Sequence, residues 1–155
     1  MHSVIIQRWN DIVNSKDEVY ILGDVSFGKV GATVDILNRL NGIKTLIIGN
    51  HDTDLIKHQE FIDCFKGGMF DLLERKFNGK HYVMCHYPML AWNKSHYGAI
   101  NLFGHLHSSW RGNKNQINVG MDCHNLCPIS IDDLPSLLEL LPENDRPSIG
   151  NKSFT

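Results

Sequence analysis

Three short apolar runs, each ending where a polar residue follows, constrain the fold of this chain most strongly. They are Val19–Gly23, Thr45–Gly49 and His81–Cys85, and Ile100–Gly104 repeats the pattern more weakly. Runs of this length that are rich in β-branched and apolar residues are typical of strands buried on both faces. We therefore expect a core of short strands whose carboxyl ends carry polar side chains.

The segment between the first two runs has helical spacing. Val30, Val34, Leu37 and Leu40 recur along one face, and Asn41-Gly42 ends the pattern. This predicts a strand, a helix and a second strand in succession. Residues 4–13 and 132–141 also have amphipathic spacing, while residues 77–80 and 111–115 have the composition of hairpin turns. The pattern predicts an α/β fold that combines helices with hairpins.

The composition fits one globular domain. The 155 residues are 42% hydrophobic and 21% charged, which suits a single core. We expect this domain to span residues 1–142, followed by a loose C-terminal tail at 143–155 that is rich in Asn, Ser, Pro and Lys.

Charge and hydropathy exclude several classes of protein. The net charge of −2 gives no broad attraction to nucleic acid or anionic lipid, so we expect neither an extended nucleic-acid surface nor a membrane contact. No apolar run approaches the roughly 20 residues of a membrane span, and Met1-His2-Ser3 does not begin a secretory signal. We expect a cytoplasmic protein, whose oligomeric state the sequence does not determine.

The four cysteines lack the spacing of a disulfide framework and are predicted to be free thiols. They are Cys64, Cys85, Cys123 and Cys127. An alternative places Cys123 and Cys127 in a structural zinc site with His105 and His107. Against it, three residues separate the two cysteines, whereas two is the usual number in zinc-binding pairs.

Four strings of Asp, Asn and His stand where the chain leaves the predicted strands. In order they are Gly23-Asp24, Gly49-Asn50-His51-Asp52, His86-Tyr87-Pro88 and Gly104-His105-Leu106-His107. Each places a possible metal ligand beside a Gly or Pro, where a side chain can be aimed at an ion beyond the strand end.

Several of these residues also have plain structural interpretations. Asp24 can bridge two cations through its two oxygens, or it can be a turn residue. Asp52 can orient His51, or it can cap a helix that begins near Asp54. A lone histidine at the position of His86 is usually structural.

The two remaining histidines have the same ambiguity. His105 and His107 alternate about Leu106, so in an extended segment both rings would face one side, where each could bind an ion or pack in the core.

Taken in order, the four strings resemble the signature of the calcineurin-like metallophosphoesterase superfamily. Its motifs read Asp-x-His, Gly-Asp, Gly-Asn-His-Asp or Glu, His, and Gly-His-x-His. The resemblance extends from about Arg8-Trp9-Asn10 to Leu134, and residues 118–122 and 128–130 resemble the closing segment of small single-domain bacterial and phage members. It implies a sandwich of two mixed β-sheets flanked by helices, with metals at the strand ends.

The resemblance also implies roles for individual residues. Asp24 would lie between two metals, with Asn50, His86 and His105 completing the protein ligands of the second. His107 would bind the first metal. His51 would stand near the leaving group as the general acid, with Asp52 behind it.

The implied activity is hydrolysis of phosphomonoesters or phosphodiesters, with a nucleotide among the possible substrates. Two divalent ions would hold the phosphate oxygens and a hydroxide, and ligands of oxygen and imidazole suit Mn, Fe, Zn, Co or Ni. Manganese is one expectation among these.

This chain departs from the family pattern at the first motif. No Asp-x-His precedes Asp24, so the first metal retains only Asp24 and His107 as ligands. We expect the first strand to be missing and the chain to be a shortened form of a longer protein. The alternative is a catalytically impaired family member that acts as a protein-binding module.

Overall fold

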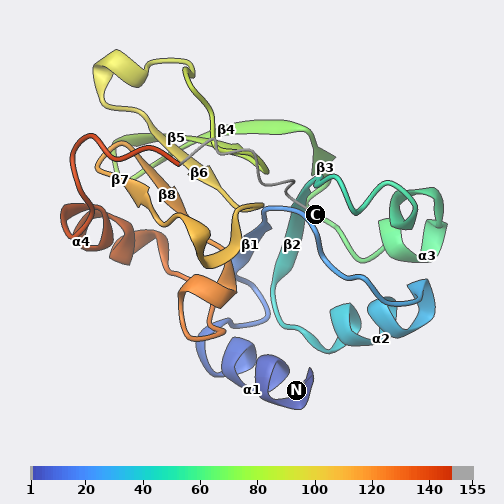
Figure 1. The fold of residues 1–155 in the computed structure, drawn as a ribbon. Helices are drawn as coiled ribbons and strands as arrows, with labels where there is room; N and C mark the ends of the chain where they lie inside the picture. The colour runs from blue at the N-terminus through green and yellow to red at the C-terminus, as the bar shows by residue number, and fades with distance from the viewer. Residues whose placement is uncertain (1, 148–155) are drawn as a thin grey trace.

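The computed structural model describes residues 2–147, which form two β-sheets with helices around them (Figure 1). The helices are α1 (His2–Ile12), α2 (Val30–Arg39), α3 (Gln59–Ile62) and α4 (Leu134–Glu139), and the strands are β1 (Glu18–Ile21), β2 (Ile43–Ile47), β3 (Met69–Phe70), β4 (Leu72–Phe77), β5 (Lys80–Cys85), β6 (Ile100–Phe103), β7 (Gly112–Asn113) and β8 (Gln116–Asn118). The predicted α/β class is confirmed, as are the helices expected at 4–13 and between the first two strands.

The two sheets differ in the direction of their strands. The first sheet has the order β1-β2-β3, and its described strands are all parallel. The second has the order β4-β5-β6-β8-β7 and is mixed, because the β4–β5 and β7–β8 pairs are antiparallel hairpins while β5, β6 and β8 run parallel. The hairpins fall at the two predicted turns, and Asn78 and Gly79 both take positive φ, as a tight hairpin turn requires.

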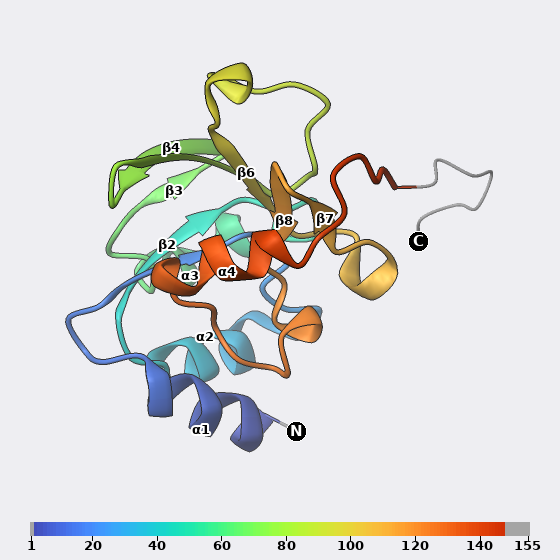
Figure 2. The same ribbon diagram turned by 90° about the vertical axis from the view of Figure 1, so that its left-hand side faces the viewer.

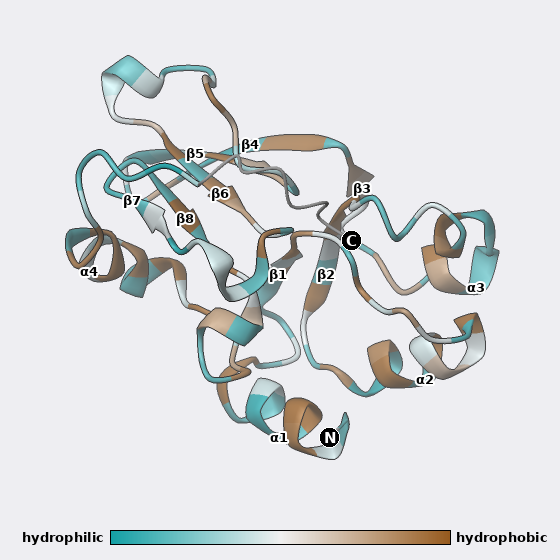
Figure 3. Cartoon of the chain, viewed as in Figure 1, coloured by the Kyte–Doolittle hydropathy of each residue, from teal (hydrophilic) through white to brown (hydrophobic). Residues whose placement is uncertain are grey.

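Adjacent residues of β2 supply two separate cores. Leu46 packs with α1, α2 and α3 on one face of the first sheet, while Ile47 packs between the two sheets with α4, and both are fully buried. Figure 2 shows α1 and α2 on the side of the first sheet away from the second sheet. In Figure 3 the central strands are coloured as apolar and the turns as polar. This layering brings the carboxyl ends of β1, β2, β5 and β6 together.

The first residues of the predicted tail contact the second sheet. The indole of Trp110 donates to the carboxylate of Asp145, and the side-chain amide of Asn113 donates to the carbonyl of Asp145. Lys114 forms an ion pair with Glu143 at 3.6 Å. The rest of the tail, 148–155, lies outside the described residues. Among residues 2–147, no helix has the length and apolar character that crossing a membrane requires.

Candidate metal centre

Asp24, His86 and His105 meet at the carboxyl ends of the strands. Their ligand atoms all lie within 4.8 Å of one another. Nε2 of His86 is 3.2 Å from Oδ2 of Asp24 and 3.2 Å from Nδ1 of His105. Oδ1 of Asn50 lies 3.1 Å from the same nitrogen. The family resemblance implied one ligand set of these four residues, and the fold brings their side chains close together.

The protonation of His86 follows from its other nitrogen. Nδ1 lies 2.6 Å from the carbonyl oxygen of Leu22, which can only accept, so Nδ1 carries the proton. In the neutral ring Nε2 then presents a lone pair, and it faces the oxygens of Asp24 and Asn50. Two acceptors and a lone pair turned toward one point repel each other unless a cation lies among them.

The donor set fits a divalent cation. Imidazole nitrogens and carboxylate oxygens bind transition metals at about 2.0–2.2 Å, which places neighbouring ligand atoms about 3 Å apart. The separations of 3.1–3.2 Å around His86 Nε2 agree with this spacing. Burial, and next the neighbouring His86, lower the pKa of His105, which favours the neutral ring that binds metals. The residues that the structure describes thus offer one group, Asp24, His86 and His105, that could hold a metal ion.

Asp52 has a role that the sequence did not indicate. Its carboxylate is fully buried and accepts three backbone N–H groups, those of Gly49, Asp24 and Val25, at 2.8–2.9 Å. It therefore fastens the loop after β2 to the loop after β1. Because three backbone donors occupy both of its oxygens, Asp52 is placed to position Asp24, and not to orient the ring of His51.

The close contact of these loops requires glycine at two positions. A Cβ on Gly49 would lie 2.4 Å from Oδ1 of Asp24, and a Cβ on Gly23 would lie 2.5 Å from Nδ1 of His86. Gly23 also has φ +81°. Asp24 itself takes φ +53°, a sparsely populated conformation for a residue with a side chain. The glycines of the two strings are thus explained by contact between the loops.

His51 stands at the exposed side of the centre. Its backbone N–H donates to Oδ1 of Asp24 at 2.9 Å, and its ring makes an edge contact with Phe27, with 4.9 Å between the ring centroids. The ring is thus outside the metal group, and the residue is exposed to solvent.

The expected extended geometry of the last string is wrong. His105 and His107 both have positive φ, and a short 3-10 helix begins at His107. His105 joins the metal group, whereas the largely exposed His107 lies 3.3 Å from the carboxylate of Asp122. The two rings therefore do not share a strand face, and His107 lies outside the described group.

The alternative zinc site is not assembled in the part of the chain that the structure describes. Cys123 directs its thiol at the carbonyl of His107 and Cys127 at that of Asn125, and no group of potential metal ligands there contains either cysteine. All four cysteines are free, as predicted.

Sequence reasoning missed the residue that shapes the last loop. Asn118 is buried, and its side-chain amide donates to the carbonyls of His107 and Trp110 while its oxygen accepts from Gly120 N–H. The available signal was weak: a single Asn between the apolar residues Ile117 and Val119. Tyr87 is a second missed residue, since its ring packs against both His86 and His105.

Two solved structures share this fold. A protein of unknown function from Aquifex aeolicus, AQ665, superimposes with a TM-score of 0.68 at 22% identity, over 88% of this chain and 84% of that one. A structure described as a novel archaeal phosphodiesterase superimposes with a TM-score of 0.53 at 19% identity, over 79% of each chain. Identities this low show likeness of fold alone.

No protein-family model matches the sequence. Sequence comparison does find relatives that align over most of their length. The uncharacterized protein MJ1445 of Methanocaldococcus jannaschii is 30% identical over 148 residues, which cover 90% of this chain and 76% of that protein. The gene 66 protein of Mycobacterium phage D29 is 30% identical over 155 residues, with 81% and 77% covered. This chain therefore belongs to the family that contains MJ1445 and the D29 gene 66 protein.

Proposed function

We propose that this protein is a metal-dependent phosphoesterase of the calcineurin-like type. The observation that carries the proposal is the convergence of Asp24, His86 and His105, with Asn50, at the strand ends. Two further observations support it: the order of the four strings along the chain, and a fold shared with a protein described as a phosphodiesterase.

Each residue of the centre would have a defined task. A divalent cation held by Asp24, Asn50, His86 and His105 would supply Lewis acidity toward a phosphoryl oxygen and a water molecule. His86 is held in one tautomer by Leu22, and Asp24 is held by the N–H of His51. These hydrogen bonds to the ligand side chains hold them in place before any ion or substrate binds.

His51 is the proposed general acid. It belongs to the same loop as Asn50, and its backbone contacts Asp24, so its ring stands beside the ligand set without joining it. A protonated ring there can give its proton to the departing oxygen of the ester and so neutralise the charge that develops on it.

The aromatic residues around the centre favour a nucleotide substrate. Phe27 beside His51 is 74% exposed, and Tyr87 beside His105 is 44% exposed. Exposed rings next to a phosphate site can stack on a nucleobase, a contact that tolerates any base. We propose a small phosphoester, with a nucleotide as the favoured class.

A substrate panel tests the proposed activity. We expect the protein with Mn²⁺ to hydrolyse at least one of bis-p-nitrophenyl phosphate, p-nitrophenyl phosphate and the cyclic nucleotides, and EDTA to abolish the activity. The measurement is release of p-nitrophenol or nucleoside monophosphate. If no substrate is hydrolysed with Mn²⁺, Fe²⁺, Zn²⁺, Co²⁺ or Ni²⁺, the enzymatic proposal is wrong.

Calorimetric titration with Mn²⁺ tests the ligand set. We expect one tightly bound ion per chain. His105→Ala should lower the affinity for Mn²⁺ about tenfold to a hundredfold or more, because it removes a side chain that binds the ion directly. His107→Ala is the matched control and should change this tight site by less than about threefold, since His107 lies outside the group. Two tight ions per chain, or equal losses in both variants, would contradict the assignment.

Leaving-group dependence tests the acid role of His51. His51→Ala should keep the tight Mn²⁺ site and lose about 10²–10⁴-fold in kcat on a cyclic nucleotide, whose alkoxide leaving group needs the proton. The loss on a p-nitrophenyl ester should be much smaller, because that group departs without protonation. His58→Ala, an exposed histidine seven positions later, is the control. Equal losses on both substrates would exclude His51 as the acid.

Asp52→Asn tests the fastening of the two loops. The amide replaces one acceptor oxygen with a donor that faces backbone N–H groups, so we expect a stability loss of about 3 kcal/mol in urea unfolding. Mn²⁺ affinity should fall as well, because Asp24 loses its support. Asp54→Asn, an exposed site two residues later, should change neither quantity. Retained stability and affinity in Asp52→Asn would show that Asp52 does not position Asp24.

A further inference from the structure

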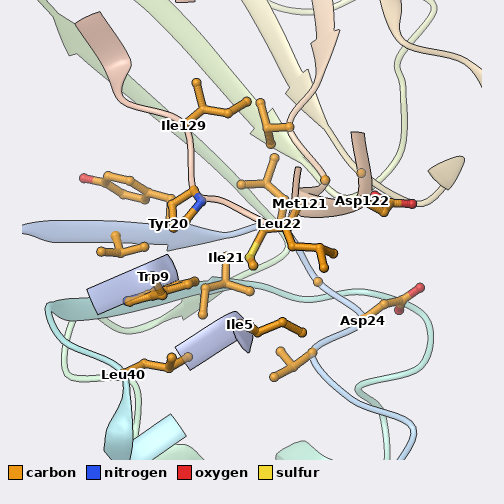
Figure 4. A pocket seen from close by; sticks show the side chains of 18 of the residues that line it. Ile5, Trp9, Tyr20, Ile21, Leu22, Asp24, Leu40, Met121, Asp122 and Ile129 are labelled. Atoms are coloured by element: carbon orange, nitrogen blue, oxygen red, sulfur yellow. The ribbon is translucent and has the colours of Figure 1, made fainter. Parts of the chain in front are cut away.

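A small pocket with basic walls lies apart from the metal centre. The cavity of about 980 Å³ along β1 reaches Asp24 (Figure 4). The small pocket, of about 190 Å³, lies instead between the β4–β5 hairpin and the turn at 94–99, and it shares no lining residue with that cavity. Lys80 begins β5 and His86 follows its end, so at about 3.3 Å per residue roughly 20 Å separate the two ends. A ligand in the small pocket would bind away from the proposed active site.

Three lysines line this small pocket together with an imidazole and a phenol. They are Lys76 of β4, Lys80 of β5 and Lys94, with His81 and Tyr97. Among residues 2–147, no Asp or Glu lines the pocket, and the ion pairs found there include none of the three lysines. An ammonium group has three donors and no acceptor, so the lysines cannot satisfy one another. An anion among them would reduce the repulsion of the three charges.

The carboxylate of Glu74 fastens the two walls of the pocket. Its Oε2 accepts from Nε2 of His81 at 2.8 Å and from the side-chain amide of Asn93 at 3.0 Å, so it ties the hairpin to the loop before Lys94. The hydrogen bond from Asn93, and next that from His81, lower the pKa of Glu74, which keeps the carboxyl ionised. Glu74 does not line the pocket, so its charge orients His81 and the loop.

The turn that forms the second wall is held by its own backbone. The carbonyl of Lys94 accepts the N–H groups of Tyr97 and Ala99 at 2.9 and 3.0 Å, and the indole of Trp92 donates to the carbonyl of Ala99 at 2.9 Å. Nζ of Lys80 lies 4.0 Å from the place that a Cβ on Gly98 would take, so this ammonium reaches from the hairpin to the turn. The basic groups are therefore arranged before a ligand binds, which lowers the ordering cost of binding.

We propose that this pocket binds a small phosphate anion, inorganic phosphate or pyrophosphate, through the ammonium groups of Lys76, Lys80 and Lys94. A phosphate group carries close to two negative charges at neutral pH and several acceptor oxygens, which match several separate donors. The volume of about 190 Å³ is below the range of about 300–1,000 Å³ that is usual for pockets of larger ligands. The net charge of −2 also opposes a long polyanion, so the small ion is favoured over nucleic acid.

Nuclear magnetic resonance titration of the isotopically labelled protein tests the site. EDTA is present, so the result does not depend on the metal centre or on the proposed function. We expect inorganic phosphate to give saturable shifts in the amides of residues 76–81 and 94–99, and pyrophosphate to bind more tightly because of its higher charge. Sodium chloride at the same ionic strength should give no saturable shift there. Oligothymidylate and phosphatidylglycerol vesicles, whose diester phosphates carry one charge each, should not displace pyrophosphate.

A pair of double variants with equal charge places the anion in the pocket. Lys80→Gln with Lys94→Gln removes two of the three ammonium groups and should weaken pyrophosphate binding about tenfold or more. Lys16→Gln with Lys57→Gln removes the same charge from exposed lysines outside the pocket and should change the affinity by less than about twofold. Circular dichroism checks that both variants fold. Absence of saturable shifts, equal losses in the two variants, shifts only at the metal centre, or displacement by oligothymidylate or vesicles would overturn the proposal.

Discussion

One buried carboxylate holds together the two loops that form the candidate metal centre. Asp52 holds the loops after β1 and β2 together by accepting N–H groups from Gly49, Asp24 and Val25. This contact holds Asp24 in its sparsely populated positive-φ conformation. In that conformation Oδ2 of Asp24 lies 3.2 Å from Nε2 of His86. Hydrogen bonds to a charged acceptor are among the strongest in proteins, and burial excludes competing water. The loops are therefore fixed before any ligand arrives.

A second contact joins the two sheets at the same place. His86 follows β5 in the second sheet, and its Nδ1 donates to the carbonyl of Leu22, which follows β1 in the first. The same bond sets the tautomer and presents Nε2 to Asp24 and Asn50. The contact that joins the sheets thus also orients one member of the candidate ligand set, so a shift between the sheets would move His86 away from Asp24 and Asn50.

The sequence by itself determined the strands, the helix between them and the hairpins, because hydropathy period and turn residues are local properties. The grouping of Asp24, Asn50, His86 and His105 came from the resemblance of the four strings to a known family signature, and the structure brings these side chains close together. Only the tertiary structure decided the role of Asp52, the separation of His107 from His105, and the support given by Asn118. These three features depend on loops that approach each other closely and on residues with left-handed backbone conformation. Contacts between segments that are distant in sequence produce both, so no periodic pattern of residues predicts them.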